Sequence, residues 1–262
     1  MERIESLSHV TVARPRTNAY WGDFSLVEAT LTLLKAAREQ ASFDWYVLIS
    51  GTSYPVKPLA ALEAALEQDA NREWIALTPI ARDSVLHNLI GRRWRLAPLL
   101  EHRGSDIRLR RLWNKMSRLV GRNFEREIGM TPYFGSQWWA LSGRCVASVM
   151  EFVDTHPSFV RAYRSVYAAD EQFFHTIVAN SEFGRFAIQV DDRGESTSHS
   201  SPLHEIATHG EGYLGAEAAD FERAKATDKF FIRKVSAERS GSLLDRIDRE
   251  LLQIENVVST LK

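Results

Sequence analysis

The stretch that decides the fold is Trp45-Tyr-Val-Leu-Ile-Ser-Gly-Thr-Ser-Tyr-Pro55. Its first five residues are apolar and rich in β-forming types, and the run is too short for a helix. We therefore predict a strand at 45–49 that is buried on both faces, as in a parallel sheet covered by helices. The cluster of Gly, Ser and Pro that follows is typical of a turn at the carboxyl end of a strand.

Helical and strand-like patterns alternate on both sides of this stretch. Residues 26–40 place apolar side chains three and four positions apart, and Asp23 or Ser25 can cap that helix with a side-chain oxygen. Residues 58–69 are helical by composition, and residues 74–78 return as a strand. The alternation predicts an α/β fold with a mixed, mainly parallel sheet flanked by helices.

The rest of the pattern completes one domain over residues 1–262, interrupted by two polar segments. Residues 92–122 are rich in arginine, and two readings stay open: a solvated, partly helical excursion, or a surface for an anionic or sugar partner. Residues 191–219 are predicted to form a mobile loop. The further predicted elements are strands at 9–14, 134–141 and 230–235, and helices at 143–153 (capped by Ser142), 169–180 and 242–261.

Composition is that of an ordinary globular protein. The 262 residues are 44% hydrophobic and 26% charged, enough for one sizeable core. The net charge of −1 gives no attraction to nucleic acid or to an anionic membrane. Cys145 is the single cysteine, which excludes an internal disulfide. Without a signal-peptide pattern or an apolar run of membrane-spanning length, we expect a cytoplasmic protein, and peripheral attachment to the inner face of the membrane stays open.

Several common catalytic motifs are absent from the sequence. There is no cysteine cluster, no His-Glu-x-x-His, no Asp-x-Asp, no Gly-x-Ser-x-Gly and no P-loop. Asp191 and Asp192 are adjacent, so in a strand they would point to opposite faces. Glu171 and His175 share a helix face, but no third ligand is visible. No metal site is therefore predicted.

Two pairs of charged residues can carry chemistry. Asp170 and Glu171 begin an apolar helix, where a carboxylate can serve as a general base for a hydroxyl or simply cap the helix. Arg233 and Lys234 follow an apolar strand, where they can offset the charge of a diphosphate leaving group or merely face solvent. The residues alone leave both alternatives open.

Five stretches stand in order along the chain: 21–27 (WGDFSLV), 48–55 (LISGTSYP), 135–142 (GSQWWALS), 170–176 (DEQFFHT) and 231–234 (FIRK). As an ordered set they resemble the core-2/I-branching β-1,6-N-acetylglucosaminyltransferase and peptide O-xylosyltransferase family. The Phe-Phe-His-Thr form at 173–176 is similar to the xylosyltransferase branch and its bacterial relatives.

The resemblance implies a GT-A-like fold, here without the family's first strand–helix unit, and single displacement with inversion and no metal. It implies that Glu171 is the general base and that Lys234, with Arg233, stabilises the departing diphosphate. The implied donor is a UDP-sugar carrying N-acetylglucosamine or xylose, and the implied acceptor is a hydroxyl on a glycan, a lipid or a protein. No cofactor and no nucleic-acid partner are expected.

The resemblance also assigns residues that would surround the two substrates. Ser53 stands where the family usually has an acidic residue. The implied donor-binding residues are Gly51, Tyr54 and His209, and the implied acceptor-binding residues are Trp138, Trp139 and Asp170. Two other classes of function stay open: an inactive or truncated relative that only binds a sugar or nucleotide, and an α/β scaffold protein that binds a partner through residues 92–122.

Overall fold

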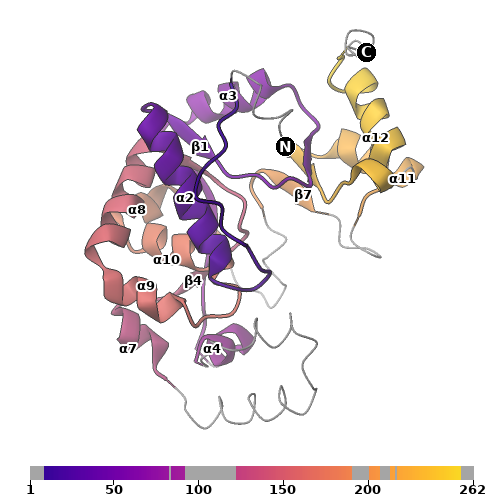
Figure 1. The fold of residues 1–262 in the computed structure, drawn as a ribbon. Coiled ribbons are helices and arrows are strands. Elements are labelled where there is room, and N and C mark those ends of the chain that lie inside the picture. Colours follow the sequence, from indigo (N-terminus) through magenta and orange to yellow (C-terminus); the bar gives the residue numbers. More distant parts are fainter. Residues whose placement is uncertain are drawn as a thin grey trace. The chain divides into compact units, whose positions relative to one another are not determined.

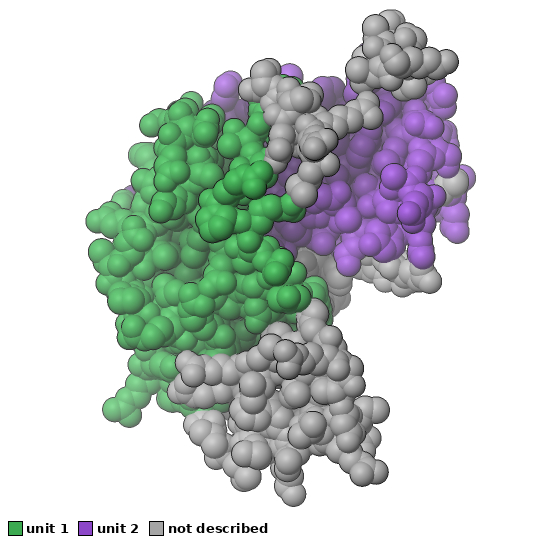
Figure 2. Space-filling model, viewed as in Figure 1, with its two compact units in different colours: residues 1–46, 79–134, 143–182 green, residues 47–78, 135–142, 183–262 purple. Residues whose placement is uncertain are grey.

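The computed structural model describes residues 9–82, 84–91, 122–190, 201–206, 213–215 and 217–254. The chain divides into two compact units, and each is described by itself (Figure 2). The first unit comprises residues 1–46, 79–134 and 143–182, and the second comprises residues 47–78, 135–142 and 183–262. A single catalytic domain over residues 1–262 stays a prediction.

The first unit is built mainly from helices (Figure 1). Its described helices are α2 (Ser25–Gln40), α4 (Val85–Ile90), α7 (Phe124–Ile128), α8 (Gly143–Thr155), α9 (Pro157–Tyr163), the 3₁₀ turn η1 (Ala169–Glu171) and α10 (Phe173–Ala179). In α2, Val27, Thr30 and Leu34 are buried at helical spacing. The N-cap position is Phe24, without a side-chain cap, so the prediction that Asp23 or Ser25 caps this helix is wrong. Asp23 Oδ1 accepts a hydrogen bond from the Ser25 N–H at 2.8 Å immediately before the helix.

Buried aromatic rings form the core of the first unit around Phe173. The centre of its ring lies 5.6 Å from that of Phe24, and 5.4 Å from those of both Phe159 and Tyr163. Burying one such side chain contributes about 1.5–3 kcal/mol. Because Phe173 is the first residue of α10, this packing anchors the chain immediately after the turn that carries Glu171.

The prediction of one continuous helix at 169–180 is wrong. Gln172 has a φ of −134°, which interrupts the helical path between η1 and α10. Its side-chain Nε2 donates to the Tyr167 carbonyl at 2.9 Å. Asp170 and Glu171 therefore lie on a short turn of their own, ahead of α10.

The second unit contains paired strands in a mixed arrangement. They are β2 (Ser53–Pro55), β3 (Glu73–Pro79), β5 (Ala140–Ser142), β6 (Ala187–Gln189), β7 (His204–Ile206) and β8 (Phe231–Arg233). Strand β3 pairs antiparallel with β5 and parallel with β6. Strand β8 lies between β2, its antiparallel neighbour, and β7, its parallel neighbour. The α/β class with mixed pairing is confirmed.

Helices α11 and α12 share an apolar core with the β2–β8–β7 sheet. The helices of the second unit are α3 (Leu59–Gln68), α11 (Ala218–Ala226), α12 (Ala237–Glu250) and the 3₁₀ turn η2 (Glu182–Phe186). In Figure 1, α11 and α12 lie side by side. The core around them consists of Val56, Leu214, Phe221, Ala224, Ile232, Val235, Leu243 and Ile247. The predicted helix at 242–261 therefore begins earlier and ends at Glu250, and residues 255–262 lie outside the described part.

Three predicted strands differ from the structure. Residues 9–14 form none, and Pro15 directly after them lacks the N–H that a ladder would need. The strand at 45–49 is shortened to β1 (Trp45–Val47) and is half-buried rather than buried on both faces. The strand at 134–141 is divided into β4 (Tyr133–Phe134) and β5, because residues 135–139 do not follow a strand path.

Strand β7 lies inside the segment 191–219 that was predicted to be a loop. The pairing of His204 with Phe231 and of Ile206 with Arg233 gives this polar stretch its strand conformation. Residues 191–200, 207–212 and 216 of the segment lie outside the described part. Three residues are too few for a periodic pattern to reveal a strand.

Gly143, at the start of α8, allows a test of the packing in the first unit. A Cβ on Gly143 would collide with the backbone carbonyl oxygen of Phe43, whereas a Cβ on Gly241 in α12 meets nothing within 4 Å. We expect Gly143→Ala to lower the free energy of unfolding by about 1–3 kcal/mol. Gly241→Ala, the matched control, should raise it by about 0.5–1 kcal/mol. Urea unfolding followed by circular dichroism measures both, and equal effects would contradict the packing described.

Candidate functional site

The predicted donor residues Gly51, Arg233 and Lys234 gather where β8 meets the turn before β2. Arg233 is in register with Ser53, and the Val235 N–H donates to the Thr52 carbonyl at 2.9 Å. The turn is closed by a 3.0 Å bond from the Ser53 N–H to the Ser50 carbonyl. The backbone pairing therefore brings together residues that are far apart in the sequence.

Lys234 presents an exposed cation beside this turn. Its backbone carbonyl accepts the Leu214 N–H at 2.8 Å, which fixes the chain, while the side chain is exposed. None of the ion pairs found within the described ranges involves its ammonium group. Gly51 is exposed, and a Cβ added there would meet no atom within 4 Å. The turn and the lysine can both face a ligand.

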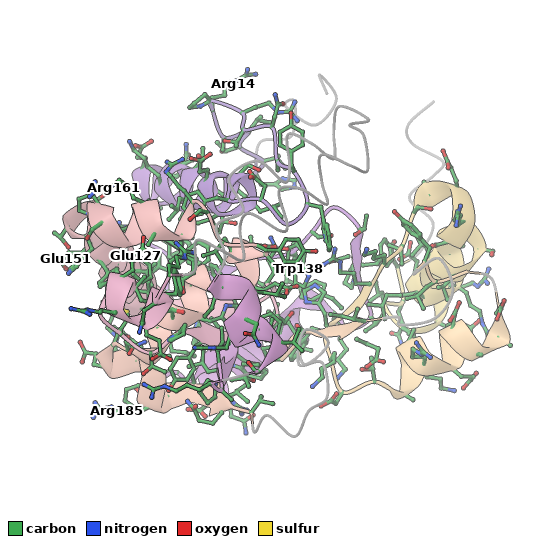
Figure 3. The ribbon with its side chains drawn as sticks, turned by 90° about the horizontal axis from the view of Figure 1, so that it is seen from below. Arg14, Glu127, Trp138, Glu151, Arg161 and Arg185 are labelled. Carbon is green, nitrogen blue, oxygen red and sulfur yellow. The ribbon has the colours of Figure 1, made fainter. Side chains whose placement is uncertain are left out.

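Arg233 lies on the indole of Trp138. The guanidinium carbon is 4.3 Å from the ring centre, a cation–π contact worth about 0.5–2 kcal/mol. Trp138, labelled in Figure 3, is only 8% exposed, and Trp139 is only 1% exposed. Trp138 thus supports the predicted donor arginine, and the acceptor-binding roles of both tryptophans stay predictions.

His204 of β7 completes this cluster, and sequence reasoning missed it. The centre of its ring lies 5.1 Å from that of Phe231, on which it stacks. It lies 5.9 Å from the centre of the Trp138 ring, whose plane is tilted relative to the imidazole. Its Nε2 lies 3.0 Å from Ser53 Oγ, and its Nδ1 lies 3.4 Å from Ser201 Oγ. No periodicity marks the residue, because it lies in a polar segment whose strand is set by a distant partner.

Burial, and secondarily the charge of Arg233, lowers the pKa of His204 to about 3. Desolvation disfavours the charged ring, and the neighbouring guanidinium repels it. The imidazole is therefore neutral at physiological pH. It can act there as a hydrogen-bond donor and acceptor but not as a cation.

Tyr54 points its hydroxyl at α12 in this structure. The hydroxyl donates to Asp248 Oδ1 at 2.8 Å. Burial and the nearby Asp248 carboxylate raise the pKa of Tyr54 to about 12. The phenol thus ties β2 to α12, and its donor-binding role stays a prediction. His209, the other predicted donor ligand, lies outside the described residues.

Residues 210–215 read Gly-x-Gly-x-x-Gly and stand between β7 and α11. Residues 210–212 lie outside the described part. The Gly215 N–H donates to Asp220 Oδ2 at 2.7 Å, and this carboxylate lies in the first turn of α11. A negative charge at this position disfavours a phosphate, so the glycine pattern is not assigned to the donor site.

Glu171 lies in the first unit, on a turn fixed by backbone bonds. The Ala168 N–H donates to the Gly22 carbonyl at 3.0 Å, and the Glu171 N–H donates to the Ala168 carbonyl at 3.2 Å. Gly22 has a φ of +72°, and a Cβ there would lie 2.9 Å from the Tyr167 ring, so glycine is required. Glu171 is half-buried, whereas Asp170 is 7% exposed. The candidate base and the candidate diphosphate ligand thus belong to different units.

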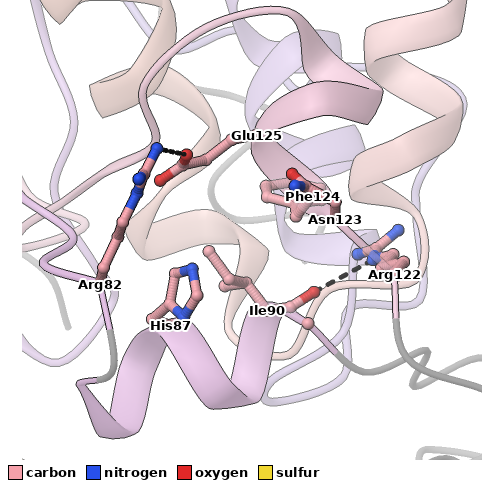
Figure 4. Close-up of a pocket in the computed structure, with 8 residues that line it drawn as sticks. Arg82, His87, Ile90, Arg122, Asn123, Phe124 and Glu125 are labelled. Atoms are coloured by element: carbon pink, nitrogen blue, oxygen red, sulfur yellow. Dashed lines mark hydrogen bonds and ion pairs between the residues drawn. The ribbon is translucent and has the colours of Figure 1, made fainter.

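A pocket of about 370 Å³ lies elsewhere in the first unit, between α4 and α7 (Figure 4). Arg82 forms an ion pair with Glu125 at 3.3 Å on one side of it. Arg122 lies on the other side, 4% exposed at its side chain, and donates to the carbonyl oxygens of Ile90 and Ala162 at 3.0 and 3.1 Å. Arg122 is thus a structural residue, and residues 92–121 of the arginine-rich segment lie outside the described part.

In the described ranges, no group of three or more His, Cys, Asp or Glu side chains is placed to hold a metal ion. No helix in those ranges is both long enough and apolar enough to cross a membrane.

The family model described as Core-2/I-Branching enzyme matches residues 1–200. The chain belongs to the Core-2/I-branching enzyme family. This is a glycosyltransferase family, so the resemblance is confirmed, and the mixed α/β fold is consistent with a GT-A-like member. The match includes Gly51, Trp138 and Glu171 and ends before β8.

A relative of this family member is "Xylosyltransferase sqv-6" of Caenorhabditis elegans. The two are 19% identical over 180 residues, which make up 68% of this chain and 20% of the relative. The chain thus spans about a fifth of the length of this curated relative.

The pKa of His204 predicts how stability changes with pH. An unfolded histidine titrates near pH 6.5, so between that value and about 3 the unfolded chain binds a proton that the folded chain does not. Stability should therefore fall as the pH drops below about 6.5. From this group we expect a loss of about 1–2 kcal/mol between about pH 7 and about pH 5.

His204→Phe keeps a ring in place and should remove this loss. Urea unfolding of both proteins at the two pH values measures the difference in slope. An identical fall in stability in the variant would show that His204 is not the group responsible.

Proposed function

We propose that this member of the Core-2/I-branching family is an inverting glycosyltransferase that moves a sugar from a UDP-sugar to an acceptor hydroxyl. Glu171 acts as general base, and Lys234, with Arg233, stabilises the diphosphate without a metal ion. The donor sugar is xylose or N-acetylglucosamine, and the named xylosyltransferase relative favours testing UDP-xylose first. The acceptor is a glycan, a lipid or a protein.

One observation carries the proposal: a basic pair is built into the sheet beside a turn that lies within the family match. The match covers the turn at 50–53 but ends before β8, and the β2–β8 register places Arg233 opposite Ser53. The pairing therefore supports extending the family's donor site to Arg233 and Lys234.

The proposed step transfers one glycosyl group. The acceptor hydroxyl oxygen attacks the anomeric carbon from the face opposite the diphosphate, and Glu171 takes the hydroxyl proton. The bond between the anomeric carbon and the diphosphate oxygen breaks with both electrons on the leaving UDP. Lys234 and Arg233 lie where that negative charge develops, so they stabilise the transition state more than the bound donor.

Glu171→Gln tests the general base. The amide keeps the shape of the side chain but accepts no proton, so we expect turnover to fall by at least about 10²-fold while UDP binding stays within about twofold. UDP release from UDP-xylose and UDP-N-acetylglucosamine measures turnover. The control is Glu182→Gln, which removes an exposed carboxylate from the first turn of η2. Wild-type turnover by Glu171→Gln would overturn the assignment.

Lys234→Ala tests the diphosphate contact. Loss of the ammonium group should weaken UDP binding by about tenfold and slow turnover further, because charge on the leaving group grows in the transition state. Equilibrium dialysis with UDP measures the affinity, and Lys225→Ala on the exposed side of α11 is the matched control. If neither quantity changes in Lys234→Ala, the basic pair is only a surface feature.

These two variants also separate an active enzyme from an inactive relative. A wild-type chain that binds UDP through Lys234 but transfers no sugar to any offered acceptor, with Glu171→Gln indistinguishable from it, would be a nucleotide-binding relative without activity. An active wild-type chain that loses turnover in Glu171→Gln would exclude that reading.

A further inference from the structure

Ser53, His204 and Ser201 form a buried chain of hydrogen bonds in the second unit. His204 and Ser201 are buried, and the three residues come from β2, from β7 and from the segment just before β7. The chain begins at the turn that lies beside Lys234 and ends at the backbone of Trp138. It therefore joins the parts of the sheet that the candidate donor site uses.

Each ring nitrogen of His204 faces a hydroxyl group. Nδ1 lies 3.4 Å from Ser201 Oγ, and Nε2 lies 3.0 Å from Ser53 Oγ. Ser201 Oγ accepts the backbone N–H groups of Leu203 and His204 at 3.3 and 3.1 Å, and it lies 3.4 Å from the Trp138 carbonyl oxygen. Ser53 Oγ in turn accepts the Ser50 N–H at 3.3 Å.

The ring also supports the indole on which Arg233 lies. Phe231 stacks on one side of His204, and Trp138 is tilted against the ring, with the Arg233 guanidinium 4.3 Å from the Trp138 ring centre. Arg233 is the charged group that lowers the pKa of His204. The carboxylate of the adjacent Glu205 instead accepts a hydrogen bond from the Thr227 hydroxyl at 3.4 Å. A neutral ring is the form that fits beside an arginine.

We propose that His204 is a positioning residue of the donor site: it couples the turn at 50–53 to the segment beside the Trp138 backbone and so holds Arg233 for the diphosphate. This inference rests on the proposed function of Arg233 and Lys234. It assigns no contact between His204 and the donor. The imidazole acts through the turn and through the indole.

The proposal predicts a specific pattern of donor affinities. The probe is whichever of UDP-xylose and UDP-N-acetylglucosamine the wild-type chain binds more tightly, measured by equilibrium dialysis. His204→Phe keeps the stacked ring but loses both bonds, and we expect binding at least about fivefold weaker. Ser53→Ala should weaken binding similarly, and Ser53→Thr, which keeps a hydroxyl, should restore it to within about twofold of wild type.

Two further variants separate positioning from general damage. The double variant His204→Phe/Ser53→Ala should bind no more than about twofold more weakly than either single variant, because both break the same link. Ser142→Ala, which removes the 2.6 Å bond from Ser142 to the buried Glu73, is the control. It should lower the free energy of unfolding without changing donor affinity. Circular dichroism establishes that each variant is folded.

The pH dependence distinguishes a neutral ring from a phosphate-binding cation. A UDP-sugar carries a doubly esterified diphosphate, whose charge does not change between about pH 8 and about pH 6. If His204 is neutral, wild type and His204→Phe should show the same pH dependence of affinity. If His204 bound phosphate as a cation, wild-type affinity would rise as the pH falls and the variant would lack that rise.

Each outcome decides one part of the account. Unchanged donor affinity in a folded His204→Phe, with Lys234→Ala still defective, would overturn the inference alone. A rise in affinity at low pH that depends on His204 would also overturn it. Absence of UDP-sugar binding by the wild-type chain would overturn the proposed function and this inference with it.

Discussion

The antiparallel pairing of β2 with β8 is the constraint on which the second unit depends. It sets Ser53 opposite Arg233 and leaves Lys234 exposed at the end of the pairing, beside the turn that begins at Ser50. A shift of one residue in this register would turn Arg233 to the opposite face of the sheet. Arg233 would then leave the Trp138 indole. The apolar core under α11 and α12 holds the register, since Ile232 of β8 is fully buried in it.

The first unit supports its own candidate group by different means. Phe173 anchors the start of α10 in an aromatic core, and the backbone bond from Ala168 to Gly22 anchors the chain before Glu171. The carboxylate is therefore carried on a turn that is fixed at both ends, as a base requires if it is to meet an acceptor hydroxyl in one orientation. The candidate base and the proposed diphosphate ligands thus belong to different units, and their roles stay predictions.

Helices and strands are predicted best from the sequence where the pattern of apolar residues is long and local. The helix at 26–40 and the strand at 74–78 follow from the spacing of their apolar residues and are confirmed. Strand β7 and the neutral His204 could not be predicted, because a three-residue strand has no periodicity and its partner lies far away in the sequence. The break at Gln172 is a change in the backbone angles of one residue, which composition does not reveal. Family resemblance supplied the roles of Glu171 and Lys234, and these roles stay predictions.

The central claim is that this chain holds a UDP-sugar through basic side chains without a metal ion. Calorimetric titration of the wild-type chain with UDP-xylose and with UDP-N-acetylglucosamine, each with and without a chelator, tests it most directly. The account predicts saturable binding of at least one donor with the same affinity in both conditions. Binding that disappears with the chelator and returns on adding a divalent cation would contradict it, as would the absence of binding to either donor.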